Sequence, residues 1–171
     1  MKLLTLAGRN KEEIFDQIER YIESQGLTII DRDTARPWGG YLVIDEKQTT
    51  PFARLFFPEE RFADIQLERK LSPKVLIVAP DKRLSWQYHH RRQEIWRVIT
   101  GHVEVMTSDT DNEGSIVKLK PGDTIRLGQG ERHRLIGTSE WGIVAEIWEH
   151  TDPLYPSNED DIVRVQDDFG R

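Results

Sequence analysis

Cysteine is absent from the 171 residues of this chain. Its absence excludes disulfides, zinc sites built on thiolates and cysteine nucleophiles. Long apolar runs are missing too, because no stretch approaches the ~20 residues that a membrane-spanning helix needs. The short apolar start of the chain also falls below the ~7–15 residues of a signal-peptide core. We therefore expect a cytoplasmic protein without a membrane partner.

An excess of positive charge is also missing, since 24 lysines and arginines face 30 aspartates and glutamates, for a net charge of −6. A general nucleic-acid binder shows a dominant basic field, so we expect no nucleic-acid partner. What the chain does have is the length of one ordinary domain, which buries about 70% of its unfolded surface on folding. Its hydrophobic content of 37% suits a soluble globular fold.

One helix is indicated near the N-terminus, where apolar residues recur at the helical period. They are Ile14, Phe15, Ile18, Tyr21 and Ile22. Asn10 is a suitable cap for the start of this helix, and Gly26 can adopt the left-handed conformation that ends it. We expect residues 1–34 to form a helical extension that packs on the main body or on a second subunit.

Beyond residue 34 the helical period is absent, and short β-rich runs follow one another between turn residues. We expect strands at 41–44, 53–57, 75–79, 84–89, 95–100, 103–107, 116–119, 124–127, 142–148 and 162–165. Many strands at this close spacing, without helices between them, are typical of an antiparallel sandwich or barrel. Residues 35–171 are therefore expected to form one all-β domain.

Candidate metal ligands occur in two places along this domain. Gln87 and His89 lie two apart on an expected strand and so share a face, and Glu94 opens the next strand. His133 follows a glycine-bounded turn far downstream. Each of these residues alone would be a surface or hydrogen-bonded side chain. Together, in a barrel built from hairpins, two imidazoles, a carboxylate and an amide oxygen suit zinc, manganese, iron, cobalt or nickel.

The spacing of these motifs resembles the two motifs of the cupin superfamily. They read His89-x4-Glu94-x6-Gly101 and Gly122-x5-Gly128-x-Gly130-x2-His133, with Gln87 where many cupins have their first histidine. More narrowly, the chain resembles the type II mannose-6-phosphate isomerase domain, which also occurs fused behind a mannose-1-phosphate guanylyltransferase. The matching segments follow the order of that family, at residues 36–39, 84–96, 130–135 and 159–171. The resemblance implies an antiparallel cupin barrel, a double-stranded β-helix or jelly roll, preceded by the N-terminal helix.

The same resemblance implies a metal-dependent aldose–ketose isomerase that interconverts mannose 6-phosphate and fructose 6-phosphate through an enediol. It implies one divalent ion, zinc first, held by Gln87, His89, Glu94 and His133. Glu146 and Lys74 are then the rival candidates for proton transfer, and Lys74 is also a candidate for phosphate contact. The residues expected to contact the substrate or its phosphate are Ser85, Arg92, Arg134 and Arg164.

The local charge supports an anionic ligand without reference to any family. Residues 74–97 contain six basic and two acidic side chains, within a chain of net negative charge.

We expect the acidic tail to fold back on the barrel, with Arg164 paired to a carboxylate or in contact with the substrate. Whether Glu146 points inward stays open at this point. Two other functions also stay open, a free-sugar isomerase of the lyxose or mannose type and a non-catalytic sugar- or metal-binding module. We expect a homodimer.

Overall fold

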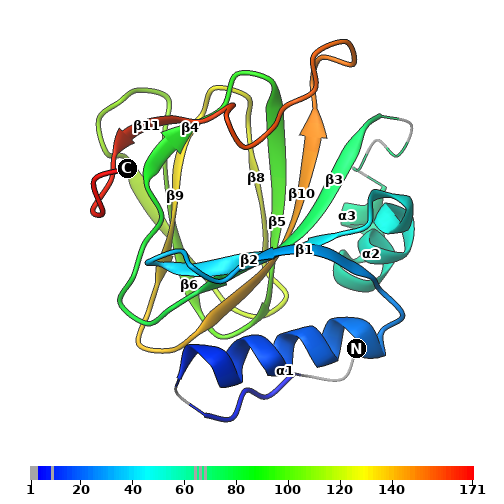
Figure 1. Cartoon of the computed structure of the whole chain (residues 1–171). Helices are drawn as coiled ribbons and strands as arrows, with labels where there is room; N and C mark the ends of the chain where they lie inside the picture. The colour runs from blue at the N-terminus through cyan, green and yellow to red at the C-terminus, as the bar shows by residue number, and fades with distance from the viewer. Residues whose placement is uncertain (1–3, 9, 64, 66, 68) are drawn as a thin grey trace.

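The structure, a computed structural model, describes residues 4–8, 10–63, 65, 67 and 69–171 (Figure 1). The N-terminal helix α1 spans Lys11–Ser24. The Asn10 side chain accepts a hydrogen bond from the Glu13 amide at 2.9 Å, and Gly26 follows the helix with a φ of +79°. Both expected helix boundaries are therefore confirmed.

The strands form two antiparallel sheets, which confirms the all-β class. The first sheet has the order β1 (Ile29–Asp33), β2 (Gly39–Ile44), β3 (Leu71–Val78), β10 (Gly142–His150), β5 (Arg92–Thr100) and β8 (Thr124–Leu127). The second has the order β11 (Val163–Gln166), β4 (Trp86–Tyr88), β9 (Arg132–Gly137), β6 (Val103–Ser108) and β7 (Ser115–Leu119). Figure 1 shows α1 running along one end of the molecule, with the other helices beside β3.

The six-stranded sheet packs against the helices on one face and against the second sheet on the other. The side chains of β10 alternate between these two faces. Ile143, Ala145 and Ile147 pack in one cluster with apolar residues of the helices, whereas Val144 packs in the second cluster, between the sheets. Because side chains alternate along a strand, Glu146 lies on the same face as Val144. The carboxylate therefore points into the interior between the two sheets.

One expected strand is wrong: residues 53–57 belong largely to a helix, α2 (Thr49–Phe56). Its buried residues Phe52, Ala53 and Phe56 lie at i, i+1 and i+4, the spacing of a helix face. Pro51 lies in the first turn, where a missing amide proton costs nothing. Two further short helices flank α2, namely η1 (Glu46–Gln48) and α3 (Glu59–Phe62).

Segments near both ends of the chain pair with the two sheets. The acidic tail returns to form β11, which pairs with β4 and places Arg164 opposite Gln87, so the expected return of the tail is confirmed. At the other end, β1 joins the six-stranded sheet by pairing with β2. The domain boundary at residue 34 stays a prediction. No helix in the described part of the chain is both long and apolar enough to cross a membrane.

Candidate metal centre

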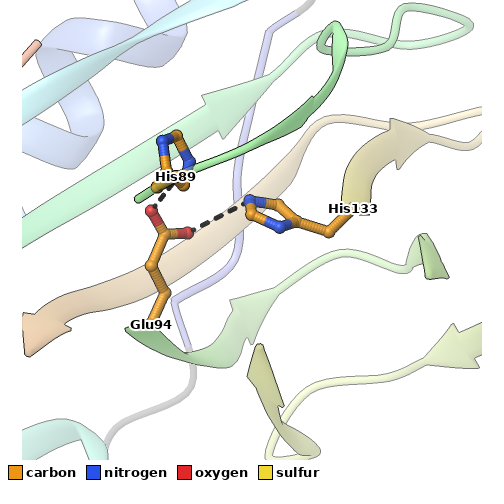
Figure 2. Close-up of side chains that lie close together, drawn as sticks. All are labelled: His89, Glu94 and His133. Carbon is orange, nitrogen blue, oxygen red and sulfur yellow. Dashed lines mark ion pairs between the residues drawn. The ribbon is translucent and has the colours of Figure 1, made fainter. Parts of the chain in front are cut away.

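Three buried side chains from different parts of the fold meet between the sheets. His89 directly follows β4, Glu94 lies on β5 and His133 lies on β9. Nε2 of His89 is 3.4 Å from Oε1 of Glu94, and Nε2 of His133 is 3.5 Å from Oε2 (Figure 2). One potential ligand atom from each residue lies within 4.8 Å of the other two. This arrangement suits a single metal ion.

The two imidazole rings are held in the orientation that a metal ligand needs. Nδ1 of His89 lies 2.6 Å from the Asp161 carbonyl oxygen, and Nδ1 of His133 lies 2.9 Å from that of Glu131. Because a carbonyl only accepts hydrogen bonds, each Nδ1 carries the proton and each Nε2 carries a lone pair. The buried Nε2 of His133 has no hydrogen-bond partner within the described residues. A metal ion would satisfy this nitrogen, so the residues present fit the group.

The local charges favour the protonation states in which these residues bind metals. Burial, aided by the nearby Arg92, lowers the pKa of His89 to about 4. Burial alone would raise the pKa of Glu94, but the charge of Arg92 and its hydrogen bond lower it below its usual range. His89 is therefore neutral and Glu94 ionised near pH 7, as metal coordination requires.

Gln87, the fourth expected ligand, lies opposite His133 in the pairing of β4 with β9. The Ser85 hydroxyl donates a hydrogen bond to Oε1 of Gln87 at 2.6 Å, and both side chains are buried. Both residues line the same cavity as Glu94. Ser85 thus fixes the direction of the Gln87 amide at the wall of the site.

The cavity beside Glu94 has more cationic than acidic side chains. Its cations are Arg36, Lys74, Arg92, Arg164 and Arg171, and its acids are Glu94, Glu146 and Glu159. The aromatic side chains Trp38, Tyr41, Trp96 and Trp148 complete much of the wall. Such a lining suits a polar ligand that carries negative charge.

Glu146 lies in this cavity next to Glu94, and the two carboxyl groups share one donor. The indole N–H of Trp96 lies 2.9 Å from Oε1 of Glu146 and 3.1 Å from Oε2 of Glu94. Burial and the charge of Glu94 raise the pKa of Glu146 well above its usual range. The pair can therefore hold one proton, on Glu146, while Glu94 stays ionised.

Lys74 projects from β3 at the position opposite Glu146 on β10. Its ammonium group lies 3.6 Å from the ring centroid of Trp148 and 4.8 Å from that of Tyr41. It also pairs with Glu159, whose side chain is 55% exposed whereas that of Lys74 is 6% exposed. The cavity thus contains a buried cation whose carboxylate partner reaches in from the surface.

Arg92 lies at the metal ligands themselves. Its Nε donates to Oε1 of Glu94 at 2.7 Å, and Nη2 is 3.2 Å from Nε2 of His89. The guanidinium also stacks on Trp148, 3.5 Å from the ring centroid. Arg92 therefore holds the Glu94 carboxylate as well as lining the cavity.

The structure separates the two other expected arginines. Arg164 lines the cavity and has no ion pair within the described residues. Arg134 is fully buried elsewhere, where its Nε donates to the Leu84 carbonyl at 2.8 Å. Its Nη2 donates to the Gln166 carbonyl of β11 at 3.4 Å, and Arg134 is not among the residues that line the cavity. The expected contact between Arg134 and the substrate stays a prediction. Arg36 and Arg171 line the cavity without having been assigned a role from the sequence, although both lie in the matching motifs.

The chain has the cupin fold, with a buried group of two histidines and a glutamate between its facing sheets that could hold a metal ion. Solved structures of this fold are similar to the chain, at identities that show the fold alone. KdgF from Halomonas sp. has a TM-score of 0.51 at 14% identity, over 76% of this chain and 89% of that one. Vicilin from tomato has a TM-score of 0.55 at 17% identity, over 81% and 35%.

The family is more specific than the fold. The family model described as "Mannose-6-phosphate isomerase C-terminal" matches residues 46–167, more than half of the chain, and the chain belongs to this family. The xanthan biosynthesis protein XanB of Xanthomonas campestris pv. campestris is 30% identical over 94% of this chain and 28% of its own length. The mannose-1-phosphate guanylyltransferase of Escherichia coli is 27% identical over 97% and 29%.

The alginate biosynthesis protein AlgA of Pseudomonas aeruginosa is similarly 25% identical, over 98% of this chain and 29% of its own length. The chain thus spans less than a third of the curated relatives it matches. The similarity also extends into the N-terminal part of the chain, which the sequence motifs left uncovered.

Proposed function

We propose that this protein is a metal-dependent aldose–ketose isomerase acting on a sugar phosphate, with mannose 6-phosphate and fructose 6-phosphate as its substrate pair. The observation that carries the proposal is a cavity in which Glu94 of the metal-ligand set, the buried Glu146 carboxyl group and more cationic than acidic side chains come together. Membership of the mannose-6-phosphate isomerase C-terminal family supports the substrate class.

His89, Glu94, His133 and Gln87 would hold one divalent ion, which we propose to be zinc. Two histidines and a glutamate form one of the ligand sets of catalytic zinc sites. Such an ion, when bound, would polarise the carbonyl group of the open-chain sugar. Arg92 keeps the Glu94 carboxylate ionised and in place through its hydrogen bond.

Glu146 is the group proposed to move the proton between C1 and C2. The isomerisation requires one residue to remove a proton from one carbon and return it to the next, through an enediol. Glu146 must be ionised to remove the carbon-bound proton, and the carboxyl group so formed then returns it to the neighbouring carbon. A raised pKa makes the ionised form a stronger base for the first step. The Trp96 N–H fixes the position of Glu146 during the exchange.

Arg164 and Lys74 are proposed to bind the phosphate group of the substrate. Both are cationic residues of the cavity wall, and hydrogen bonds between such groups and a phosphate are charge-assisted. Replacing Arg164 by alanine should raise the KM for the phosphorylated sugar and weaken competition by inorganic phosphate. An unchanged KM would remove Arg164 from the site.

A coupled assay on purified protein tests the reaction. We expect turnover of mannose 6-phosphate that a chelator abolishes and added zinc restores, with inorganic phosphate as a competitor. Metal binding without turnover of any sugar would instead identify a binding module. Turnover of free lyxose or mannose, insensitive to phosphate, would identify a free-sugar isomerase.

We further propose that the protein is a homodimer. Strand β7 forms an edge of the five-stranded sheet and exposes Ile116 and Val117, 48% and 42% accessible. An exposed apolar edge strand is a surface on which a second copy can pair. Light scattering that gives the mass of a single chain would contradict this.

A further inference from the structure

A short segment between β10 and β11, residues 157–161, lies against the metal ligands; we call it the C-terminal clamp. Its last residue, Asp161, is buried. The two carboxylate oxygens of Asp161 accept hydrogen bonds from the backbone amides of His90 and Arg91, at 3.1 and 3.0 Å. Its backbone carbonyl accepts the Nδ1 proton of His89 at 2.6 Å. One residue thus holds three consecutive positions of the loop that carries the ligand His89.

The first residue of the clamp, Ser157, connects Asp161 to the rest of the site. Its hydroxyl group donates to Oδ2 of Asp161 at 2.6 Å and accepts from Nη1 of Arg92 at 2.9 Å. Its backbone amide donates to Nδ1 of His150, on β10, at 2.9 Å. The clamp is therefore anchored to the six-stranded sheet and contacts the arginine that holds Glu94.

We infer that Asp161 is a positioning residue for the metal ligand His89. Its carbonyl selects the tautomer that leaves the lone pair on Nε2, and its carboxylate fixes the backbone from which the ring projects. The ion-pair distance from Asp161 to the Arg91 guanidinium is 3.8 Å, longer than any of the other contacts named, so a surface salt bridge does not account for the buried carboxylate. The inference rests on the proposed metal centre, but it does not depend on the sugar or on the reaction.

The test is the affinity of the protein for zinc, measured by competition with a chromogenic chelator. Asp161→Asn keeps the size of the side chain but leaves one acceptor oxygen where two are used. Loss of such an outer hydrogen-bond partner typically weakens metal binding by about 10–100-fold. We expect an increase of that size in the zinc Kd. Asp160→Asn, the same change of charge at the exposed neighbouring residue, is the matched control and should leave the Kd unchanged.

The readout separates positioning from a general loss of structure. A merely structural defect would reduce the number of zinc sites per chain while the remaining sites kept the wild-type Kd, and that result would overturn the inference. Equal Kd values for the two variants would also overturn it. If Asp161→Asn does not fold, the zinc Kd of Ser157→Ala is measured instead, because this variant removes one donor to Asp161. A raised Kd supports the inference, and an unchanged Kd refutes it. Wild-type protein that binds zinc without isomerase turnover would contradict the proposed reaction alone.

Discussion

At the scale of single residues, the site shows how environment gives two chemically identical groups different roles. Glu94 and Glu146 are both buried and share the Trp96 N–H. Arg92 donates directly to Glu94, which keeps that carboxylate ionised. Glu146 faces the resulting negative charge and is therefore the more easily protonated member of the pair. One carboxylate is thus suited to binding a cation and the other to exchanging a proton.

Replacing Glu146 by glutamine tests this division. The change keeps the size of the side chain but removes the exchangeable proton, so we expect kcat to fall by about 10²–10⁴-fold. Zinc content measured by elemental analysis should stay at one ion per chain. Glu104→Gln on β6, outside the cavity, is the control and should leave kcat unchanged. Full turnover in the Glu146 variant would require a different proton carrier, with Lys74 the next to test.

Replacing His133 by alanine tests the metal ligands. The change removes the buried Nε2 that lacks another partner, so elemental analysis should find no stoichiometric metal. His102→Ala is the control, since His102 is exposed and pairs with Glu140 at 2.6 Å. Stoichiometric metal in the His133 variant would contradict the proposed ligand set.

At the scale of helices and strands, the sequence predicts those elements whose apolar residues follow a clear period. The stripe from Ile14 to Ile22 predicts α1, and the runs after residue 74 predict most strands. The sequence does not predict strand β9, because its inward positions carry His133 and Gly137 beside the apolar Leu135, and a single apolar residue shows no alternation. The aromatic composition of α2 favours a strand, but the segment is a helix, because the spacing of Phe52 and Phe56 places both side chains on one helix face that packs in the core.

Some parts of the candidate site could likewise be predicted from the sequence, and others could not. His89, Glu94 and His133 could be predicted to meet, because each lies in a motif whose spacing is specific. The contribution of Arg134 could not be predicted, since only the fold shows that its side chain donates to the Leu84 carbonyl. The motif at residues 159–171 and the expected return of the tail predict that this segment meets the barrel, but its hydrogen bonds to the His89 loop could not be predicted. They join residues about 70 positions apart, such as Asp161 with His90 at a separation of 71.

The link between β10 and the clamp predicts how stability changes with pH. Burial, aided by the charge of Lys70 and opposed by Glu46, lowers the pKa of His150 from 6.5 to about 4. The unfolded chain therefore binds a proton between these values while the folded protein does not. The contribution of His150 to stability is complete above pH 6.5 and is lost as the pH falls towards 4.

Urea unfolding between pH 7 and 4 measures this effect. His150→Asn removes the titrating group, so its free energy of unfolding should fall less steeply than that of the wild type as the pH is lowered. Part of the loss should remain, because His89 titrates with the same sign. His102→Asn, at the exposed histidine, should keep the wild-type profile. Parallel profiles for His150→Asn and the wild type would contradict the assignment.

At the scale of the whole molecule, the six-stranded sheet has the apolar core with the helices on one face and the residues of the candidate site on the other. One face packs against the helices in a cluster of apolar residues, including Ile14, Ile18 and Phe52. The other face carries the cavity residues Lys74, Glu94 and Glu146. The alternation of side chains along β10 places the two functions on opposite sides of one backbone. The helical layer therefore supports the sheet without reaching the site.

Ile18→Ala in α1 tests this separation. Ile18 is fully buried, and removing such a side chain typically costs about 2–5 kcal/mol in the free energy of unfolding. Urea unfolding should show a loss of this size with an unchanged slope. The kcat of the folded variant should equal that of the wild type, because no cavity residue loses a contact. Arg20→Ala, on the exposed face of the helix, is the control and should change neither quantity. A selective loss of turnover in a variant of undiminished stability would place α1 within the reach of the active site, contrary to the packing that the structure shows.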